Sequence, residues 1–497
     1  MHNDYMNKKF IVTIILAIVA TISARAIEQY HFQSGTAVLK GRVLNKPTDE
    51  WNIISVIIQN AFTDEDAQVF TIPVAADGSF ESRIPLPYSQ SIKVEDVDFM
   101  FLAVGDTLEM TKDAKLVDEE GVTFIGNTLS AKINRLWPKV RQHYFGKDKL
   151  LIMGLTRDKI PAWKKQMVKQ MDKVIADIEG DRLPLPAGTS VFEKEVLGAS
   201  LLSEPFMAIM ENYRYNMTTG GLYKIKKDEL GEYNDILASR QKWLLDNPAM
   251  LFVIPSPGAF ISYVGAYVMF DVAFTRKEAG ESRADYYRKA TRIAHNRYGL
   301  KDTDFMQQIA LCCHVFRENL LEEGSDPDVM AEYFTAIIPL ISSPIVAQHA
   351  LDRYRQYVKQ RELKVVEQKP MTKGDSIFQR IIEPYKGNAL YVHFWGMYCG
   401  PCRAEMLAER EKVELMKDKP VRFIYICDEK ESPREPTEKW LADNNIKGEH
   451  IYVSHEEWKF LAEKFNIYAP PFSTGVDKDG NIVTINEVNN YAYDMLK

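Results

Sequence analysis

Residues 392–405 read Val-His-Phe-Trp-Gly-Met-Tyr-Cys-Gly-Pro-Cys-Arg-Ala-Glu, and this stretch decides the fold of the last part of the chain. It begins inside an almost continuous apolar run, residues 389–395, which is typical of a strand buried on both faces of a parallel sheet. Two cysteines, Cys399 and Cys402, follow where the strand gives way to a helix expected over residues 402–415. The pattern therefore predicts a strand, a cysteine pair and a helix in direct succession.

The residues around this stretch alternate between helical and strand patterns. Helices are expected over 375–385, 402–415, 435–445 and 457–465, and strands over 389–395, 421–427 and 450–453. Two further strands flank Asp479-Gly480, and a terminal helix follows them. Such alternation predicts an α/β sheet that is closed by an antiparallel hairpin.

The position of the cysteine pair at the start of a helix predicts redox chemistry. Unpaired backbone N–H groups and the positive end of the helix dipole lower the pKa of a cysteine placed there, so we expect Cys399 to be the attacking nucleophile. Cys402 lies one turn further on and can resolve the mixed disulfide that Cys399 forms.

Two other interpretations of the pair are weaker. A zinc half-site needs two more ligands, and no second CxxC or HxxxH pattern lies nearby. A purely structural disulfide across two residues closes too short a loop to stabilise much. No metal site or bound cofactor is expected.

The same stretch resembles the active site of exported thioredoxin-like thiol-disulfide oxidoreductases of the TlpA/ResA group, and the resemblance covers about the last 130 residues. Downstream, residues 468–480 resemble the family's cis-proline loop and the hairpin after it. Pro471, six residues before Asp477, matches the cis-proline. The resemblance implies a thioredoxin fold, and it implies that Pro471 helps to form a groove for the substrate.

Several neighbouring residues receive roles from the same resemblance. Glu405 matches a glutamate one helical turn after Cys402, where it either shuttles protons or is a solvated helix residue. Tyr398 replaces the usual tryptophan and keeps an aromatic ring beside the substrate. Pro470 removes a backbone donor from the edge of the groove. His393 stands where thioredoxins hold a buried acid; it either accepts a proton from Cys402 or is an ordinary buried strand residue.

The other three cysteines are expected to be structural. Cys312 and Cys313 are adjacent on an expected helix, so their side chains diverge and a bond between them is improbable. Cys427 ends an expected buried strand, and a buried free thiol is the expectation there.

The chain before residue 365 predicts two further domains. Residues 27–128 predict an antiparallel β-sandwich-like domain, with a hairpin at Asp77-Gly78. Residues 129–364 are expected to form an α-helical domain, and residues 365–497 are expected to form the thioredoxin-like domain. The first two resemble the N-terminal extensions of TlpA-type proteins of Bacteroides-like bacteria. The strands are expected over 37–43, 51–59, 69–74, 79–84, 99–104 and 122–125, and the helices over 131–144, 162–178, 192–213, 229–245, 285–298, 304–321 and 327–364.

The N-terminus predicts export. Lys8 and Lys9 precede thirteen mostly apolar residues, and Ala24-Arg25-Ala26 supplies a cleavage pattern, so residues 1–26 are expected to be a cleaved signal peptide. The alternative, an uncleaved anchor, needs about twenty apolar residues. A second apolar run, 251–274, is interrupted by prolines and predicts a buried core helix over 259–270. The expected location is the periplasm, with membrane contact only through the transient signal peptide.

Composition limits the partners. The 497 residues include 62 basic and 69 acidic ones, a net charge of -7, so nucleic acid is not an expected partner. The expected partners are protein thiols and disulfides and an unidentified electron donor. Reduction is the favoured direction because the Gly-Pro dipeptide is that of thioredoxin, whose potential is about -270 mV. The alternative function is a periplasmic binding or scaffold protein with a thioredoxin-fold adaptor and little turnover; a peroxidase has no support around Cys399.

Overall fold

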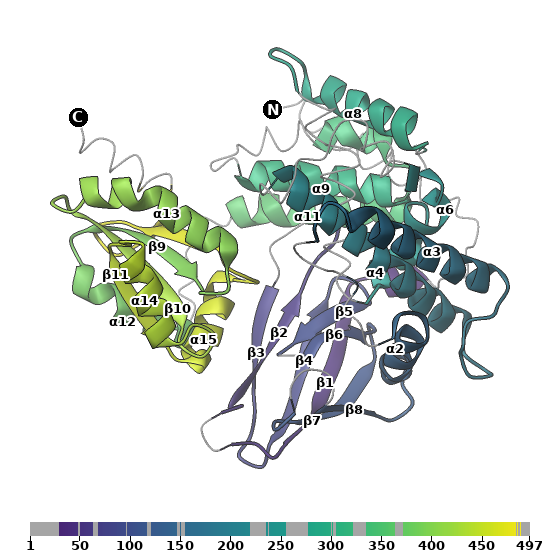
Figure 1. Ribbon diagram of the computed structural model, residues 1–497, viewed down its shortest axis with the longest axis horizontal. Helices are drawn as coiled ribbons and strands as arrows, with labels where there is room; N and C mark the ends of the chain where they lie inside the picture. The colour runs from purple at the N-terminus through teal and green to yellow at the C-terminus, as the bar shows by residue number, and fades with distance from the viewer. Residues whose placement is uncertain are drawn as a thin grey trace. The chain divides into compact units, whose positions relative to one another are not determined.

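The computed structural model of the chain describes its residues in segments. These are 29–47, 50–62, 68–95, 97–116, 121–146, 150, 155–218, 235–236, 238–254, 277–299, 301, 305–321, 334–362, 371–483, 485 and 488. The expected signal peptide, the core helix expected over 259–270 and the terminal helix lie outside the described residues. The chain divides into two compact units (Figure 1): the first comprises 1–45, 58–65 and 77–365, and the second comprises 46–57, 66–76 and 366–497.

The first unit contains a four-stranded sheet in the order β4-β1-β7-β8. Strand β1 pairs antiparallel with β4 and parallel with β7, and β5 pairs antiparallel with β6. The sequence prediction missed β5 and β7, in which polar residues interrupt the apolar pattern: Gln90 and Ser91 are themselves buried in β5, and polar residues alternate with the buried ones in β7. The bounds are β1 (Gly35–Leu44), β4 (Ser79–Leu86), β5 (Gln90–Val94), β6 (Val97–Leu102), β7 (Thr107–Asp113) and β8 (Val122–Ile125).

The hairpin predicted at Asp77-Gly78 is wrong. The turn forms, with Gly78 at φ +85°, but the strand after it, β4, pairs with β1. The N–H of Val43 donates to the carbonyl oxygen of Gly78 at 2.8 Å, and a Cβ at Gly78 would clash with the carbonyl of Val43. An Asp-Gly pair indicates only that the local backbone turns. The close approach of Gly78 to Val43 of β1 determines that β4 pairs with β1.

Helices make up the remainder of the first unit. The longer ones bury one apolar stripe, as in α3, where Trp163, Met167, Met171 and Val174 recur at helical spacing. The bounds are α2 (Leu129–Phe145), α3 (Ile160–Glu179), α4 (Val191–Thr218), α6 (Gln241–Leu244), α8 (Arg283–Tyr298), α9 (Phe305–Leu321) and α11 (Pro344–Glu362).

The single helix predicted over 327–364 is wrong in its described part. Residues 334–337 are helical, a short 3₁₀ turn, Ile338–Leu340, follows them, and α11 begins only at Pro344. Proline has no N–H to donate to the preceding turn, so it is tolerated at the first position of a helix and disfavoured in its interior. Pro344 therefore starts a new helix.

The second unit is built on a five-stranded sheet in the order β11-β10-β9-β12-β13. Strands β9, β10 and β11 are parallel, β12 runs antiparallel to β9, and β13 runs antiparallel to β12. This is the α/β sheet with an antiparallel hairpin that the sequence predicted. The bounds are β9 (Ala389–Trp395), β10 (Val421–Asp428), β11 (Glu449–Val453), β12 (Phe472–Val476) and β13 (Ile482–Val483).

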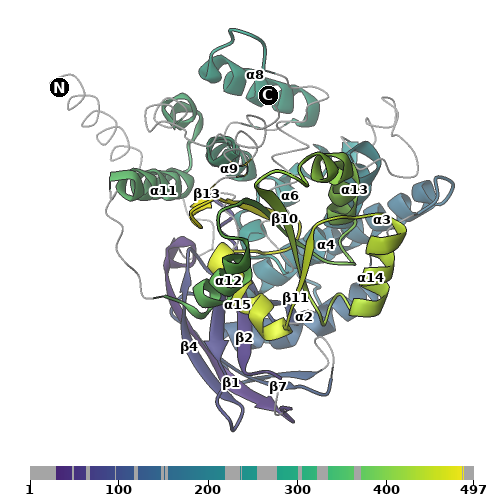
Figure 2. The same cartoon turned by 90° about the vertical axis from the view of Figure 1, so that its left-hand side faces the viewer.

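Helices cover both faces of this sheet (Figures 1 and 2). Cys402, Met406 and Leu441, from α13 and α14, pack with Trp395 and Tyr425 on one face. Residues of α12 and α15 pack with the alternate side chains of β9 and β10 on the other face. The central strand β9 is therefore buried on both sides, as its apolar run predicted. The bounds are α12 (Lys373–Ile382), α13 (Gly400–Leu415), α14 (Arg434–Asp443) and α15 (His455–Phe465).

Strands β2 (Ile53–Ile58) and β3 (Gln68–Pro73) bring part of the N-terminal sequence into the second unit. Both the N–H and the hydroxyl of Thr71 donate to the Glu463 carboxylate of α15, at 3.1 and 2.8 Å. Val69 lies in the core that α15 shares with the sheet. The second unit thus includes two strands that lie some 300 residues before the rest of it in the sequence.

We expect Glu463→Ala to destabilise the second unit by about 1–3 kcal/mol, because the N–H and hydroxyl of Thr71 lose their acceptor together. Urea unfolding of the full chain measures the change. Glu411→Ala is a matched control, since Glu411 is an exposed glutamate on α13. Equal unfolding midpoints for the two variants would contradict the assignment.

Candidate active site

The cysteine pair lies where β9 ends and α13 begins. Cys399 is the N-terminal cap of α13 in an extended conformation, and its Sγ accepts a hydrogen bond from the N–H of Cys402 at 3.1 Å. The two cysteines form a disulfide, with their Cα atoms 5.3 Å apart. Pro401 occupies the first turn, where a missing N–H costs nothing. The sequence therefore brings two sulfurs together at the positive end of a helix.

The two sulfurs differ in access. Cys399 is 6% exposed, whereas Cys402 is fully buried among Trp395, Met406 and the other residues of that core. After reduction, the helix N-terminus favours the thiolate form of Cys399. An incoming disulfide can reach Cys399, while Cys402 can react only with a sulfur already bonded at that position.

An exposed aromatic residue, Tyr398, directly precedes the pair in the chain. Tyr398 is 59% exposed and its ring rests over Gly396, where a Cβ would come 2.6 Å from a ring carbon. Partial desolvation by neighbouring residues and the negative charge of Glu431 raise the pKa of Tyr398 to about 12. The hydroxyl is therefore protonated at neutral pH and remains available as a hydrogen-bond donor.

The peptide bond between Pro470 and Pro471 is cis. Pro471 is exposed and Pro470 half-buried. Strand β12 begins with the next residue, Phe472, which pairs with Phe394 near the end of β9. Because β12 runs antiparallel to β9, Pro471 lies at the end of the sheet where the chain leaves β9 for the cysteines.

His393 and Glu405 approach each other beneath the first turns of α13. His393 is fully buried, and its Nδ1 lies 2.9 Å from the Ser473 hydroxyl and 3.9 Å from Oε2 of Glu405. Burial lowers the pKa of His393 to about 4. Glu405 is half exposed, and partial burial together with the charge of Glu409 raises its pKa. The pair thus consists of a neutral imidazole and a carboxyl group that holds its proton more tightly than usual.

The sequence analysis missed three polar residues of this site. Ser432 is buried, and its hydroxyl accepts a hydrogen bond at 3.0 Å from the N–H of Met397, in the loop that leads to Cys399. Ser473 fixes His393. One carboxylate oxygen of Glu409, Oε2, is buried in the second unit. No sequence signal marks them, because Ser432 and Ser473 are single polar residues and Glu409 follows Glu405 at the spacing of a solvated helix face.

Comparison with known proteins gives a consistent but partial match. No family model matches the chain. It is 24% identical over 153 residues to the thiol-disulfide oxidoreductase ResA of Bacillus cereus, covering 30% of this chain and 84% of ResA. With ResA of Bacillus thuringiensis it shares 24% identity over 103 residues, 20% of this chain and 56% of ResA. The chain is similar to thiol-disulfide oxidoreductases.

Solved structures show the same partial likeness. The thioredoxin domain of a thiol-disulfide oxidoreductase from Bacteroides vulgatus is 20% identical, covering 23% of this chain and 84% of that chain, with a TM-score of 0.21. StoA from Bacillus subtilis is 19% identical, covering 22% and 85%, with a TM-score of 0.19. These likenesses extend over about a quarter of the chain, so the resemblance of residues 27–364 to Bacteroides-type extensions stays a prediction.

The remaining cysteines are free and buried, as expected. The thiol of Cys313 donates to the carbonyl oxygen of Ala61 at 2.8 Å. Burial, with Asp428 adding its charge, raises the pKa of Cys427 to about 12, and burial also raises the pKa of Cys312. The thiols of Cys312 and Cys427 therefore stay protonated at neutral pH and are poor nucleophiles.

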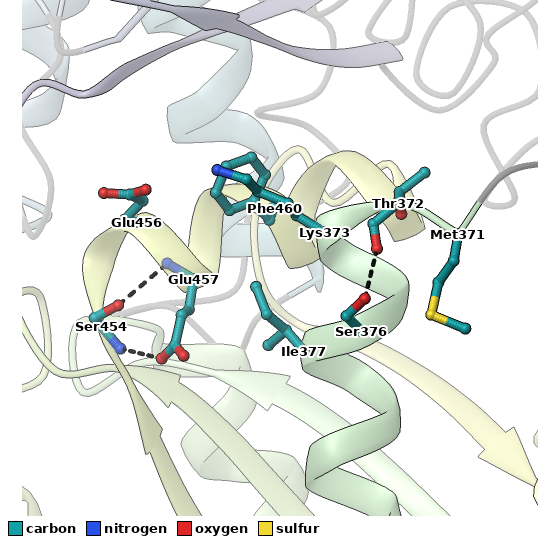
Figure 3. Close-up of a pocket in the computed structure, with 9 residues that line it drawn as sticks. All are labelled: Met371, Thr372, Lys373, Ser376, Ile377, Ser454, Glu456, Glu457 and Phe460. Carbon is teal, nitrogen blue, oxygen red and sulfur yellow. Dashed lines mark hydrogen bonds between the residues drawn. The ribbon is translucent and has the colours of Figure 1, made fainter.

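A groove of about 470 Å³ lies apart from the cysteines, at the N-terminal ends of α12 and α15 (Figure 3). Its polar groups already serve as helix caps: Ser454 and Glu457 cap α15, and Thr372 caps α12. Within the described residues, no three His, Cys, Asp or Glu side chains cluster as metal ligands. Nor does any described helix have the length and apolar character to span a membrane.

We expect alkylation of the reduced protein at pH 7 to modify Cys399 at least about tenfold faster than any other cysteine. Cys399 alone among the five cysteines caps a helix N-terminus, which favours its thiolate, and at 6% its side chain retains the largest exposed fraction. Iodoacetamide labelling followed by peptide mass mapping measures each rate. Equal labelling of Cys402 or Cys427 would contradict this ordering.

Proposed function

We propose that the protein is an exported thiol-disulfide oxidoreductase that reduces protein disulfides through its Cys399-Gly-Pro-Cys402 dithiol. One observation carries the proposal: the two cysteines form a disulfide at the N-terminus of α13, where Cys399 caps the helix and is 6% exposed, whereas Cys402 is fully buried. A structural bond needs no such difference in access. An oxidoreductase needs one sulfur to meet the partner and another that is held back.

The reaction begins with the thiolate of Cys399. It attacks one sulfur of the partner disulfide, that bond breaks, and the departing partner thiolate takes up a proton. Cys402 then loses its proton to the carboxylate of Glu405, one helical turn away, and attacks the Sγ of Cys399. The Cys399–Cys402 bond forms, the second partner thiol leaves, and two electrons have passed to the partner. An electron donor must then reduce the pair again.

The surface beside Cys399 serves the partner. The exposed ring of Tyr398 offers apolar contact and a hydroxyl donor. The cis bond before Pro471 lies at the end of β12, where an extended partner segment can pair with the chain. Pro470 has no N–H, so fewer backbone hydrogen bonds are available here and side-chain contacts carry more of the binding.

Export to the periplasm through residues 1–26 is part of the proposal, and it rests on the sequence of that segment. The partners are extracytoplasmic proteins with disulfides, together with a thiol donor. The net charge of -7 argues against nucleic acid as a further partner.

The mature full chain with Cys402→Ser should trap partners as mixed disulfides, because Cys399 still attacks and nothing resolves the product. Cys399→Ser should abolish both trapping and disulfide reduction. Cys427→Ser is the matched control, since Cys427 is a buried free thiol in the same unit. Non-reducing gels and an insulin-reduction assay give the readouts. Partner binding that persists without reduction would instead favour the scaffold.

The rate of mixed-disulfide release should rise with pH through the ionisation of Glu405. Burial and Glu409 raise the pKa of Glu405, so the inflection should lie above the ordinary value of a glutamate. Glu405→Gln should remove this inflection and slow release on the order of 100-fold. Stopped-flow measurement of release from a model mixed disulfide tests this, with Glu411→Gln on the same helix as control. An unchanged profile in Glu405→Gln would exclude Glu405 as the base.

A further inference from the structure

A buried carboxylate lies at the end of strand β10, next to the end of β9 from which the chain departs toward the cysteines. Cys427 of β10 pairs in register with Trp395, the last residue of β9, and Asp428 is the next residue of β10. Asp428 is 3% exposed. Taking a carboxylate out of water is costly unless its oxygens accept hydrogen bonds, so both oxygens of Asp428 need donors.

Each carboxylate oxygen of Asp428 meets a different donor. Oδ1 accepts a hydrogen bond at 2.9 Å from the N–H of Lys430, in the loop that follows β10. Oδ2 lies 2.6 Å from Nδ1 of His455, the first residue of α15. A carboxylate accepts hydrogen bonds and cannot donate them, so Nδ1 carries the proton in this contact. Such charge-assisted bonds are roughly twice as strong as bonds between neutral groups, and this one joins the start of α15 to the end of β10.

The backbone of the same segment closes the loop 428–432. The carbonyl oxygen of Asp428 accepts a hydrogen bond from the N–H of Ser432 at 2.8 Å. The N–H of Glu429 donates to the carbonyl oxygen of Val453 at 3.0 Å, two residues before α15 begins. Ser432 itself is fully buried. The loop 428–432 is therefore held both to the sheet and to the segment that starts α15.

Ser432 connects this loop to the cysteines. Its hydroxyl accepts a hydrogen bond from the N–H of Met397 at 3.0 Å. Met397 lies in the turn 396–399, where the N–H of Cys399 donates to the carbonyl oxygen of Gly396 at 2.9 Å. Hydrogen bonds therefore run without a gap from the start of α15, through the loop, to the turn that places the sulfur of Cys399 at the N-terminus of α13.

The other charged side chains of this region form exposed pairs. Arg434 binds Glu429, and Lys430 lies 3.9 Å from Glu50. Both partners of each pair are about half exposed, and ion pairs of this kind contribute little because water and salt screen them. The contact of His455 with the buried Asp428 is thus the ion pair that can fix the loop.

We propose that His455 is a positioning residue for the active site: through Asp428 it fixes the loop 428–432, and Ser432 of that loop holds the turn that leads to Cys399. The proposal rests on the proposed function, in which Cys399 attacks the partner disulfide. It adds a residue outside the cysteine segment that keeps the sulfur of Cys399 in line with the N–H of Cys402. No proton or electron passes through His455.

The test measures the reactivity of Cys399 in the reduced full chain. Alkylation by iodoacetamide across a range of pH, followed by peptide mass mapping, gives the pKa of the Cys399 thiol. His455→Ala removes the donor to Asp428, so Cys399 should be held less firmly and the bond that its thiolate accepts from Cys402 should weaken. The pKa of Cys399 should then rise by about half a unit, which is about a threefold slower alkylation at pH values below the midpoint.

His455→Asn is the rescue variant, because its side-chain amide places an N–H near the position of Nδ1, and it should restore most of the native profile. Arg434→Ala is the control for charge: it removes a cation next to the same loop and leaves the bonds of Asp428 and Ser432 in place. It should leave the profile of Cys399 unchanged. An equal shift in Arg434→Ala would assign the effect to net charge and overturn the proposal.

Ser432→Ala cuts the last link directly, by removing the acceptor of the Met397 N–H. It should shift the profile of Cys399 in the same direction, and adding His455→Ala to it should change the profile no further, because both substitutions act through one contact. A lower urea midpoint of His455→Ala with a native Cys399 profile would show a purely structural role and overturn the proposal.

The His455 side chain is 32% exposed, so its truncation leaves no large cavity. If His455→Ala still does not fold, His455→Gln replaces it, since the longer side chain keeps the bulk but does not place its amide at the position of Nδ1. An unchanged Cys399 profile in His455→Gln would then overturn the proposal.

Alkylation of Cys399 needs no partner, so the two proposals can be refuted separately. Intact partner trapping by Cys402→Ser, with no effect of His455 on Cys399, would remove only the role of His455. Absence of trapping with a shifted Cys399 profile in His455→Ala would remove the proposed function and leave His455 as a residue that positions a reactive thiol.

Discussion

The hydrogen bond from the N–H of Cys402 to the sulfur of Cys399 joins the chemistry of this protein to its fold. It makes a reactive sulfur the cap of α13, in a position that serines and aspartates usually occupy. The same bond stabilises the helix end and the negative charge on Cys399 after reduction. The remaining structure of the second unit serves to hold this helix end in place.

Strand β9 contributes most to fixing the position of the N-terminal end of α13. It lies in the centre of its sheet, with β10 on one side and β12 on the other, and helices cover both of its faces. Its last residue, Trp395, is buried, and Ser432 ties down the loop that follows. Because a packed interior resists displacement, the position of Cys399 relative to Pro471 is set by the whole sheet and does not depend on the loop alone.

Local signals were sufficient for the elements that carry the cysteines. Each of these signals depends only on residues close by in the sequence: the apolar run of β9, the cysteine spacing and the proline pair. The structure agrees with the elements predicted from them. Contacts between segments that are distant in the sequence could not be predicted from such local signals. The docking of β3 on α15 depends on Thr71 meeting Glu463, and neither residue carries a signal that points to the other. The Asp77-Gly78 turn gave a wrong hairpin for the same reason.

The polar residues beneath α13 show a related limit and a physical distinction. In the sequence, Glu405 and Glu409 look alike, since both are glutamates on one helix at a spacing of four residues. Their environments differ, because one carboxylate oxygen of Glu409 is buried in the unit, whereas Glu405 is half exposed and lies 3.9 Å from Nδ1 of His393. Two identical side chains on one helix can therefore differ in how far water reaches them, and their spacing in the sequence does not reveal it. The residue at position 393 matters in the same way: a buried acid there would add a like charge near Glu405, whereas burial lowers the pKa of His393 to about 4, so its imidazole is neutral at physiological pH and adds no charge.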